Sequence, residues 1–570
     1  MFSRRSPRRL SSNPVDRNPS PPVILLLLFV VAVGGAALQG FGASESGPKL
    51  SATPPMSWSA WAHYQCGYTA QTIINNAEEL VKTGLAARGY NTVRITECWM
   101  QKKRDASGNL KADPQRFPQG IGPVARAIHR LGLKVSIYGD AGYATCAGYQ
   151  GDGQPKGGGK DYFLRDAKLY ASWGVDYLKL DGCNVYVPPG STKEATYRKA
   201  YAAEAAALKA VGRPVVFLES APAYFQGTPE WYDVLTWVRD YGQWWREGTD
   251  MANFDAKDPN QPRFDSVLWN YAYNLPLGRF QKPGNWNDPD FIIAGDGGMS
   301  LAESRSQMAL WSMMSAPLSL SLDIGKLSPE ALAILGNKAI IAVDQDPLGR
   351  MATLVRRTPV MDVLFKPLTS GDDAVAVLNR GEAPAKVDLH PADLGFAASS
   401  GCTLDAKDLW NGKEQSSVSA LQMEVASHDT AIWRIHPSGQ CGKPSRTGTI
   451  TLTANVRSQK HSIDGYARCL ASPGSVETCV GTAAERWIVT PGAALRSSDG
   501  ECLALAKGKP VLEACRPAES QRWRYTLKGN LINAARHHCL SAAGAETGSQ
   551  TLVMQPCGHN LPNQIWSLPN

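Results

Sequence analysis

The chain has 570 residues, of which 43% are hydrophobic and 19% charged, a composition typical of an ordinary globular protein that is too long for one domain. A formal net charge of +8 would suit an anionic partner such as nucleic acid. Residues 1–22, however, hold five arginines and one aspartate, a net charge of +4, so half of the excess lies in one short segment. The charge therefore does not indicate a nucleic-acid-binding protein.

That basic segment precedes an apolar run, Val23–Leu38, which is followed by small residues. A basic start, an apolar core and small residues are typical of a secretory signal peptide. The run nearly reaches membrane-spanning length, so a retained signal-anchor is the alternative. We expect residues 1–49 to be a signal peptide or signal-anchor with a linker. The remainder is expected to be secreted or extracytoplasmic, with no membrane association beyond such an anchor.

Short apolar strands alternate with amphipathic helical stretches between residues 50 and 351. Repeated helix-then-strand units indicate right-handed βαβ connections on a parallel sheet, an α/β fold. Continued repetition over about 300 residues favours a closed (β/α)8 TIM barrel over an open sheet. The clearest strands are expected at 91–96, 133–138, 175–180 and 213–219.

The helical rhythm ends at residue 351, and two further domains are expected after it. Residues 352–440 contain short alternating strands such as "AVAVLN" and "TAIWRIH", which favour an antiparallel β-sandwich. Residues 441–570 contain a threefold repeat in which each unit starts with Cys-Leu, continues to a second cysteine and ends on a tryptophan. A unit near 40 residues cannot bury a core alone, so three units must close on one another. This segment resembles the ricin-type β-trefoil.

Twelve cysteines, an even number, suit an oxidising compartment. No CxxC pair with a matching second pair or nearby histidines occurs, so no zinc or other metal site is expected. The repeat predicts one local disulfide in each unit, while the pairing of Cys402 and Cys441 stays open. The three expected bridges are Cys469–Cys479, Cys502–Cys515 and Cys539–Cys557.

The strand ends of the barrel carry many acids and aromatic residues. Barrel enzymes place their catalytic groups at these C-terminal ends. The stretch "YLKLD" puts Lys179 and Asp181 into an apolar strand, where charges are costly unless they are paired or used. Acids and aromatics without an obvious metal cluster suggest a sugar site that works with two carboxylates.

Several motifs occur in an order that resembles glycoside hydrolase family 27, the α-galactosidase family, over residues 52–440. These are "PPMSWSAW", "ITECWM", "SIYGDAGYATCAG", "YLKLDGC", "WWREGTD" and "NWNDPDF", followed by "QMALWSMMSAPL". The resemblance implies a retaining exo-glycosidase that releases terminal α-D-galactosyl residues from oligo- or polysaccharides through a covalent glycosyl-enzyme. It also implies that no cofactor is needed.

The resemblance carries roles onto individual residues. Asp181 would be the nucleophile, and Asp250, four residues after Arg246, the acid/base. Asp181 must stay ionised to attack, whereas Asp250 must hold a proton for the leaving oxygen and later activate water. Lys179 lies two residues from Asp181, hence on the same strand face, and would bind sugar hydroxyls while favouring the ionised nucleophile.

The remaining pocket residues follow from the same motifs. Trp58 would form the apolar wall, with core packing as the alternative, and Tyr138 a neighbouring contact. Arg246 and Asp290 would hold the side of the 2-hydroxyl. Two disulfides are implied, Cys146–Cys183 beside the nucleophile and Cys66–Cys98.

Two departures from the family pattern concern the identity of the sugar. The family usually has paired aspartates, which bind the 4- and 6-hydroxyls, where this chain has Thr96 and Glu97. A neutral threonine contacts the 6-hydroxyl more weakly, and a pentopyranose lacks that hydroxymethyl group. A β-L-arabinopyranosidase, known within this family, is therefore an alternative.

The second departure is "FLESAPAY", the loop that reads the 2-position. Galactosidases carry a glutamate there, and α-N-acetylgalactosaminidases carry small serine and alanine residues. Alignment from the strand makes Glu219 the selector. Alignment on Pro222 makes Ser220 and Ala223 the small pair, and both registers stay open.

The trefoil would offer polysaccharide binding, but its sugar-binding positions depart from the usual pattern. The aspartate that normally follows Cys-Leu is replaced by Ala471, Ala504 and Ser541, and Gln521 and Gln564 are expected mainly to support the core. A catalytically silent carbohydrate-binding protein is the alternative of another class. Retention of both Asp181 and Asp250 argues against it.

Overall fold

The structure is a computed structural model that describes residues 50–397, 401–453, 468–545 and 548–569. The expected signal segment, residues 1–49, lies outside the described residues. Among the helices that are described, none combines the length and apolar character that a bilayer crossing requires.

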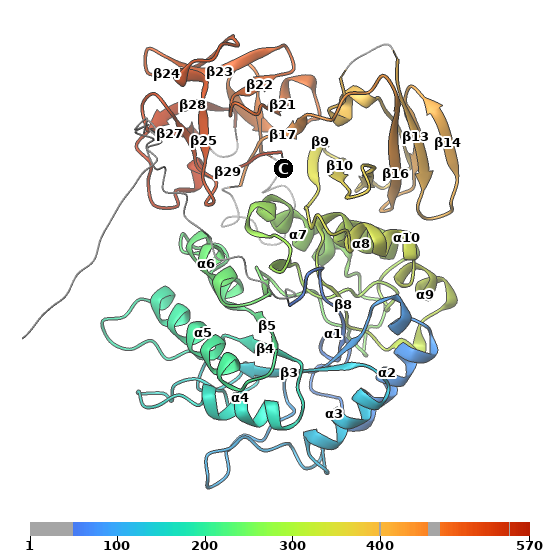
Figure 1. The fold of residues 1–570 in the computed structure, drawn as a ribbon, viewed down its shortest axis with the longest axis vertical. Helices are drawn as coiled ribbons and strands as arrows, with labels where there is room; N and C mark the ends of the chain where they lie inside the picture. The colour runs from blue at the N-terminus through green and yellow to red at the C-terminus, as the bar shows by residue number, and fades with distance from the viewer. Residues whose placement is uncertain (1–49, 398–400, 454–467, 546–547, 570) are drawn as a thin grey trace, which may run out of the picture. The chain divides into compact units, whose positions relative to one another are not determined.

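Eight parallel strands form one curled sheet in the order β7-β6-β5-β4-β3-β2-β1-β8. Figure 1 labels β3, β4, β5 and β8 of this sheet. Because β8 returns to pair with β1, the first and last strands are neighbours, and a parallel bridge between Ile292 and Leu320 joins the segment after β7 to β8. The predicted TIM-barrel fold is confirmed. The strands are β1 (Met56–Ser59), β2 (Thr92–Ile95), β3 (Lys134–Asp140), β4 (Tyr177–Asp181), β5 (Val216–Glu219), β6 (Trp244–Arg246), β7 (Trp286–Asp288) and β8 (Leu318–Leu320).

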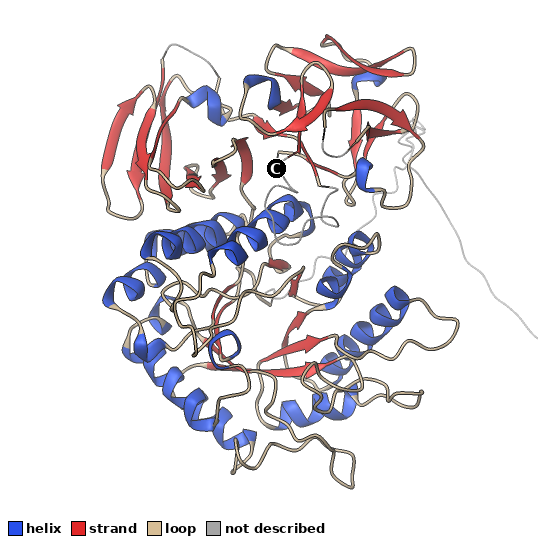
Figure 2. Cartoon of the chain, turned by 180° about the vertical axis from the view of Figure 1, so that it is seen from behind, coloured by secondary structure: helices blue, strands red, loops and turns tan. Residues whose placement is uncertain are grey.

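The barrel helices lie around the strands (Figure 2). Two of them begin with a reciprocal capping box, formed by Thr69 with Thr72 and by Ser300 with Glu303, which satisfies backbone N–H groups that a helix start leaves unpaired. The helices are α1 (Trp61–Tyr64), α2 (Ala70–Lys82), α3 (Ile121–Arg130), α4 (Phe163–Ser172), α5 (Lys193–Ala210), α6 (Trp231–Trp237), α7 (Phe264–Asn274), α8 (Leu301–Met314), α9 (Pro329–Leu335) and α10 (Lys338–Asp344).

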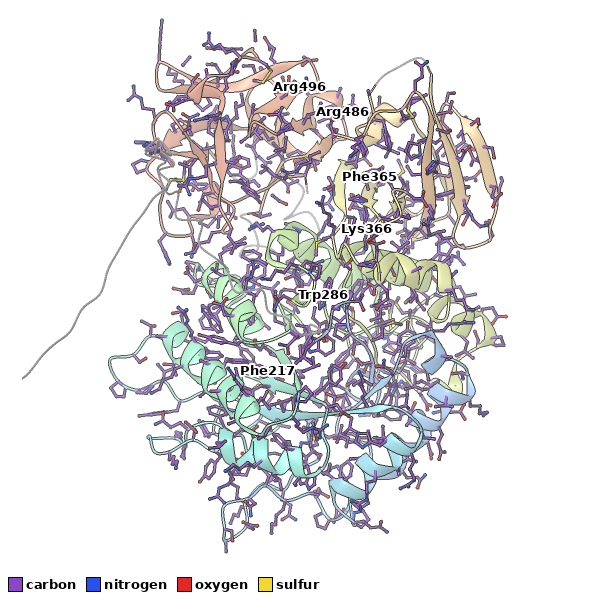
Figure 3. The ribbon with its side chains drawn as sticks, viewed as in Figure 1. Phe217, Trp286, Phe365, Lys366, Arg486 and Arg496 are labelled. Carbon is purple, nitrogen blue, oxygen red and sulfur yellow. A yellow bond between two sulfur atoms is a disulfide. The ribbon has the colours of Figure 1, made fainter. Side chains whose placement is uncertain are left out.

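Side chains along each barrel strand point alternately into the barrel interior and toward the surrounding helices. Phe217 belongs to the large core that includes the helices, whereas the next residue, Leu218, belongs to a separate cluster with Trp244 and Trp286 inside the barrel. Figure 3 labels Phe217 and Trp286. Adjacent side chains of a strand point to opposite faces, so every second residue reaches the interior. This rule places Lys179 and Asp181 on the interior face of β4, at the open end.

The second part of the fold is an antiparallel sandwich. A six-stranded sheet in the order β14-β13-β16-β11-β10-β9 accompanies a two-stranded sheet, β12-β15. Buried Lys366 of β10 (Figure 3) joins this domain to the barrel helices by donating hydrogen bonds of 2.7 Å to the carbonyls of Ser312 and Val343 and to the hydroxyl of Ser315. The strands are β9 (Thr353–Arg357), β10 (Met361–Pro367), β11 (Asp373–Asn379), β12 (Ala385–Leu389), β13 (Cys402–Asp408), β14 (Glu414–Val418), β15 (Leu421–Val425) and β16 (Thr430–Gly439).

The last part consists of short antiparallel strands and shows the threefold repeat directly. In each unit the indole N–H of the terminal tryptophan donates to the carbonyl of the leucine in Cys-Leu. The donors Trp487, Trp523 and Trp566 are buried, and the three distances are 2.8, 2.9 and 3.0 Å. These recurring contacts fit the expected β-trefoil. The described strands are β17 (Arg446–Thr449), β18 (Thr451–Leu452), β19 (Arg468–Ala471), β20 (Ser475–Thr478), β21 (Arg486–Val489), β22 (Leu495–Ser497), β23 (Glu501–Ala506), β24 (Lys509–Ala514), β25 (Trp523–Tyr525), β26 (Leu531–Asn533), β27 (Cys539–Ala543), β28 (Gln550–Gln555) and β29 (Trp566–Ser567).

All twelve cysteines are paired. The bridge that the sequence left open joins Cys402 to Cys441, so it ties β13 to the chain just after β16. The domain boundaries at 351/352 and 440/441 stay a prediction. The other pairs are Cys66–Cys98, Cys146–Cys183, Cys469–Cys479, Cys502–Cys515 and Cys539–Cys557.

Candidate active site

The C-terminal ends of the barrel strands surround a cavity of about 310 Å³. Parallel strands bring their ends to one edge, so residues that are far apart in the chain meet there. Nine of the predicted catalytic and sugar-binding residues line it: Thr96, Glu97, Tyr138, Lys179, Asp181, Ser220, Ala223, Arg246 and Asp250. The other lining residues are Trp61, Cys146, Cys183, Tyr224, Gly248, Thr249 and Phe291.

Asp181, the last residue of β4, has both carboxylate oxygens engaged. Lys179 Nζ lies 3.3 Å from Oδ2, and the hydroxyl of Tyr224 donates to Oδ1 at 2.7 Å. Burial alone would raise the pKa of Asp181, but Lys179, the Tyr224 hydrogen bond and Arg246 outweigh it, so that the pKa lies below its ordinary value. The Lys179 ammonium also lies 5.5 Å from the ring centre of Tyr138. Asp181 is therefore ionised at neutral pH.

Asp250 and Arg246 form the opposite arrangement, an exposed acid on a buried cation. The side chain of Asp250 is 74% exposed, and its Oδ1 accepts from Arg246 Nη2 at 3.0 Å. The guanidinium is held in turn by Asp290 Oδ1 at 2.8 Å and by the carbonyls of Gly248 and Thr249. The buried network thus fixes Arg246 and leaves Asp250 at the mouth of the cavity.

Asp290 lies directly behind this network. It is buried, it adopts a left-handed backbone conformation with φ of 81°, and its Oδ2 accepts from the Met251 N–H at 2.6 Å. Burial raises the pKa of Asp290 to about 7; Arg246 opposes that rise, whereas the carboxylates of Asp250 and Asp288 add to it. Asp290 does not line the cavity itself. It contributes to the cavity by holding Arg246 and the backbone of Met251, which follows Asp250.

Thr96 and Glu97 follow β2 at the other side of the cavity. Both residues are buried, each with 3% of its surface exposed. Glu97 Oε1 accepts a hydrogen bond of 2.7 Å from the N–H of Ala147. Burial raises the pKa of Glu97. The side chain of Thr145 also hydrogen-bonds to the Glu97 carboxylate, so protein groups hold this carboxylate in place at the edge of the cavity.

The loop after β5 has two alternative alignments, one with Glu219 and one with Ser220 and Ala223 at the 2-position of the sugar, and the structure shows which of these residues line the cavity. Ser220 and Ala223 line the cavity, and the hydroxyl of Ser220 has no hydrogen-bond partner among the described residues. Glu219 does not line it. Its fully buried carboxylate packs against Gly242, where a Cβ would approach Glu219 Oε1 to 2.2 Å. Successive residues at a strand end face opposite sides, so the geometry favours Ser220 and Ala223 over Glu219 as the residues that face a bound sugar.

Two aromatic residues also differ from expectation. Trp58, expected as the apolar wall, is fully buried, and its indole N–H donates to the Leu322 carbonyl at 2.8 Å; the tryptophan that lines the cavity is Trp61. The chain leaves β1 at Ser59 and turns into α1, which carries the second tryptophan to the cavity. Tyr224 was missed altogether, although it follows Ala223 in the loop singled out from the sequence.

Within the described ranges, one group of His, Cys, Asp and Glu side chains converges as metal ligands do: Asp140, Cys146 and Cys183. The two sulfur atoms form a disulfide. The group therefore offers a single carboxylate, too few ligands for a metal site.

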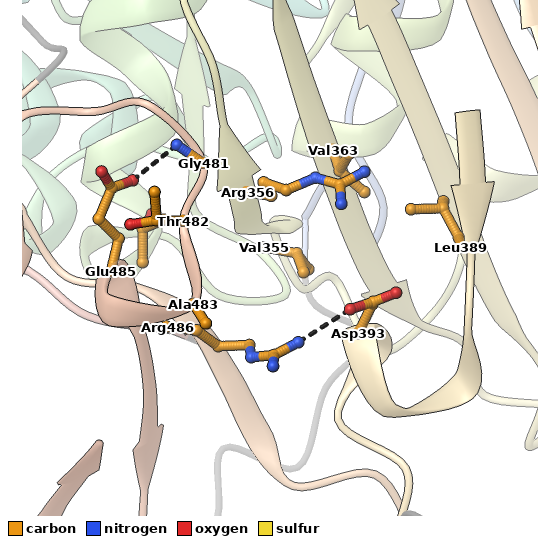
Figure 4. Close-up of a pocket in the computed structure, with 11 residues that line it drawn as sticks. Val355, Arg356, Val363, Leu389, Asp393, Gly481, Thr482, Ala483, Glu485 and Arg486 are labelled. Carbon is orange, nitrogen blue, oxygen red and sulfur yellow. Dashed lines mark hydrogen bonds and ion pairs between the residues drawn. The ribbon is translucent and has the colours of Figure 1, made fainter. Parts of the chain in front are cut away.

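A second cavity, of about 140 Å³, lies between sandwich and trefoil residues (Figure 4). Three of its four charged side chains, Asp393, Glu485 and Arg486, have local partners. Arg486 lies 2.8 Å from Asp393, and Glu485 accepts from the backbone N–H of Gly481 at 2.9 Å. These local partners and the small volume favour a structural junction over a reaction site.

Comparison with known protein families covers nearly the whole chain. Residues 53–346 match the family described as alpha galactosidase A, residues 359–435 the alpha galactosidase C-terminal beta sandwich domain, and residues 455–566 the ricin-type beta-trefoil lectin domain.

Individual relatives agree with these matches. An α-galactosidase A of Aspergillus niger is 36% identical over 553 residues, which cover 95% of this chain and 96% of that protein. An α-N-acetylgalactosaminidase of Gallus gallus is 36% identical over 406 residues, covering 68% of this chain and 92% of that protein. Among solved structures, α-galactosidase I from Mortierella vinacea superposes with a TM-score of 0.60 at 29% identity, covering 68% of this chain and 97% of that one. With its barrel, its sandwich and its C-terminal trefoil matched in order, the chain belongs to the α-galactosidase A family of glycoside hydrolases.

Proposed function

We propose that the protein is a retaining exo-glycosidase that hydrolyses terminal α-D-galactosyl residues of oligo- or polysaccharides. The observation that carries the proposal is the pair of unlike carboxylates in one cavity. Asp181 is partly buried, with 15% of its side chain exposed, and is kept ionised by Lys179 and Tyr224, whereas Asp250 is exposed at the mouth on the Arg246 guanidinium. Two carboxylates with different environments are what a double displacement at a glycosidic carbon requires.

The reaction then has two steps. In the first, Asp181 attacks the anomeric carbon while Asp250 gives its proton to the leaving oxygen, which forms a glycosyl-aspartate and releases the aglycone alcohol. In the second, Asp250 takes a proton from water, the resulting hydroxide attacks the anomeric carbon, and the bond to Asp181 breaks. The exposure of Asp250 allows water to reach it between the steps. Two inversions retain the configuration.

The other lining residues would position the sugar. Lys179 and Glu97 carry free hydrogen-bonding capacity beside the nucleophile, and Trp61 and Tyr138 offer apolar surface to a sugar face. Arg246, held by buried Asp290, would donate to the hydroxyl next to the anomeric carbon.

A second candidate substrate is an α-N-acetylgalactosaminide. The support is Ser220 and Ala223: two small side chains line the cavity, and the buried Ser220 hydroxyl has no hydrogen-bond partner in the part of the chain that the structure describes. A free buried donor suits an acetamido carbonyl, because a buried polar group without a partner costs free energy. A β-L-arabinopyranoside stays a third candidate, since Thr96 offers no charge to a hydroxymethyl group.

We also propose that the protein acts outside the cytoplasm and that the trefoil binds polysaccharide. Six disulfides support the first proposal. The match to a lectin domain supports the second.

Hydrolysis of 4-nitrophenyl α-galactoside, α-N-acetylgalactosaminide and β-L-arabinopyranoside by the full chain tests the proposal. We expect turnover of the α-galactoside, with the first-formed sugar in the α configuration by proton NMR, and no turnover by a folded Asp181→Asn variant. Absence of turnover on all three substrates would favour the silent carbohydrate-binding protein. Undiminished activity of Asp181→Asn would remove Asp181 from the nucleophile role.

A further inference from the structure

The trefoil lacks an acidic sugar ligand at each of the three positions that follow Cys-Leu. Ala471, Ala504 and Ser541 are all buried, at 6%, 0% and 0% exposure, and the hydroxyl of Ser541 accepts from Gln564 Nε2 at 3.0 Å. Gln521 and Gln564 are buried too, and both bind backbone groups of their own repeat. These positions serve the core, so a carbohydrate on this domain must be held elsewhere.

A groove of about 780 Å³ lies over strands β17, β21, β22 and β25 of the trefoil. Three arginines line it, Arg446, Arg496 and Arg524, and its lining contains no acidic residue. Among the described residues, no carboxylate forms an ion pair with any of the three; Figure 3 labels Arg496. Four other arginines of the trefoil have carboxylate or backbone carbonyl partners: Arg468, Arg486, Arg516 and Arg522. Among the described residues Arg496 and Arg524 have no such partner, and Arg446 binds one backbone carbonyl, so the groove concentrates available positive charge.

The groove is anchored rather than loosely formed. Arg446 Nη2 donates to the Pro569 carbonyl at 2.8 Å, and the hydroxyl of Tyr525 donates to the Trp566 carbonyl at 2.8 Å. Trp523 forms a buried part of the lining, and Pro491 and Tyr525 offer apolar surface beside the charges. Apolar and aromatic surface with a few convergent polar groups is typical of ligand sites.

We propose that this groove binds an anionic polysaccharide, whose carboxylate or sulfate groups pair with Arg446, Arg496 and Arg524 while its sugar rings lie against Tyr525 and Pro491. Guanidinium groups match planar oxyanions through two parallel N–H donors. The volume lies in the range of sites that enclose a drug-sized ligand, about 300–1,000 Å³, and so accommodates a short oligosaccharide segment. The inference rests on the proposed carbohydrate-binding role of the trefoil, and it adds the place and the charge of the ligand.

Affinity electrophoresis of the full chain tests the site, in native gels that contain polygalacturonate, dextran sulfate or neutral galactomannan. We expect retardation by at least one anionic polymer, which distinguishes carboxylate from sulfate, and a loss of affinity of at least tenfold in Arg496→Glu/Arg524→Glu. The matched control is Arg516→Glu/Arg522→Glu. It changes the net charge equally in the same domain, at arginines that pair with Glu513 and Glu519 outside the groove. Thermal unfolding verifies folding, and the milder Arg524→Gln replaces the double variant if that one does not fold.

Three results would overturn the inference. These are no retardation by either anionic polymer, equal loss in groove and control variants, or retardation by galactomannan that equals that by the anionic polymers. Hydrolysis of an aryl α-galactoside by the unmodified chain is measured separately. Active enzyme without retardation removes the groove alone, and retardation without hydrolysis removes the proposed activity alone.

Discussion

The hydroxyl of Tyr224 donates a hydrogen bond of 2.7 Å to Oδ1 of Asp181. The same hydroxyl lies 3.0 Å from the sulfur of Cys183 and 3.7 Å from that of Cys146. Tyr224 therefore links the carboxylate at the end of β4 to the disulfide that joins the loops after β3 and β4. Because Lys179 occupies Oδ2, both oxygens of Asp181 are oriented before any substrate arrives.

Replacement of Tyr224 by phenylalanine removes this hydrogen bond and keeps the ring. A hydrogen bond to a charged group contributes about 1.5–3 kcal/mol, so we expect kcat/KM to fall roughly 10- to 100-fold. The bond also favours the ionised carboxylate, so the acid limb of the pH profile should move to higher pH. Tyr241→Phe is the control, since Tyr241 contacts Arg198 and does not line the cavity. An unchanged profile in Tyr224→Phe would contradict the orienting role.

Lys179→Met tests the cation beside the nucleophile. Burial raises the pKa of Asp181 and Lys179 lowers it, so loss of the ammonium must raise that pKa. An opposite charge within about 4–6 Å lowers the pKa of a carboxyl by about 1–3 units. The acid limb of the kcat/KM profile should therefore move to higher pH by a similar number of pH units. The exposed Lys168 on α4 provides the control, Lys168→Met. The measurement is kcat/KM from pH 3 to 8; a limb at the wild-type position would show that Lys179 does not act on Asp181.

Periodicity predicts those parts of the protein in which one pattern repeats many times. The alternation along "YLKLD" places Lys179 and Asp181 on one face. The repeated Cys-Leu and tryptophan positions predict a threefold unit, and in the structure the same indole-to-carbonyl contact recurs in each unit. Each residue in such a repeating pattern is assigned together with its neighbours, so an ambiguity at one position does not change the predicted strand or repeat.

The residues that sequence reasoning misplaced lie where a strand ends and a turn begins. Trp58 and Trp61 stand in one apolar stretch, and only the exit of the chain from β1 at Ser59 decides which of them reaches the cavity. Glu219 and Ser220 pose the same problem at the end of β5, where the pocket of Glu219 is made by Gly242, a residue distant in the chain. Tyr224 lies in a short 3-10 turn, which carries no periodicity to identify the side it faces.

The loop after β5 gives a prediction about the sugar. Ser220→Glu and Ala223→Leu both fill space beside the nucleophile that a 2-acetamido group would need. We expect either substitution to lower kcat/KM for the α-N-acetylgalactosaminide relative to the α-galactoside by roughly tenfold or more, since overpacking of about this size costs about 1–3 kcal/mol. Glu219→Gln is the control, because Glu219 does not line the cavity. An equal loss on both substrates would show that this loop does not read the 2-position.

Asp362 of β10 gives a prediction about stability. It is fully buried and accepts from Arg357, Arg380 and Tyr271, which joins the sandwich to α7. Burial would raise the pKa of Asp362, but the two guanidinium groups outweigh it and lower that pKa. A carboxyl whose pKa is lower in the folded than in the unfolded state stabilises the fold above its ordinary pKa of about 4 and loses this contribution as the pH falls further. At pH 7, Asp362→Asn should therefore destabilise the protein by about 3–5 kcal/mol, because two buried cations lose their partner. In calorimetry at pH 7 and pH 3, the loss of stability of Asp362→Asn relative to wild type should be smaller at pH 3. The control is Asp388→Asn at an exposed position of β12, which should resemble wild type at both pH values. A loss of stability that does not change with pH would mean that the ion pair is not its source.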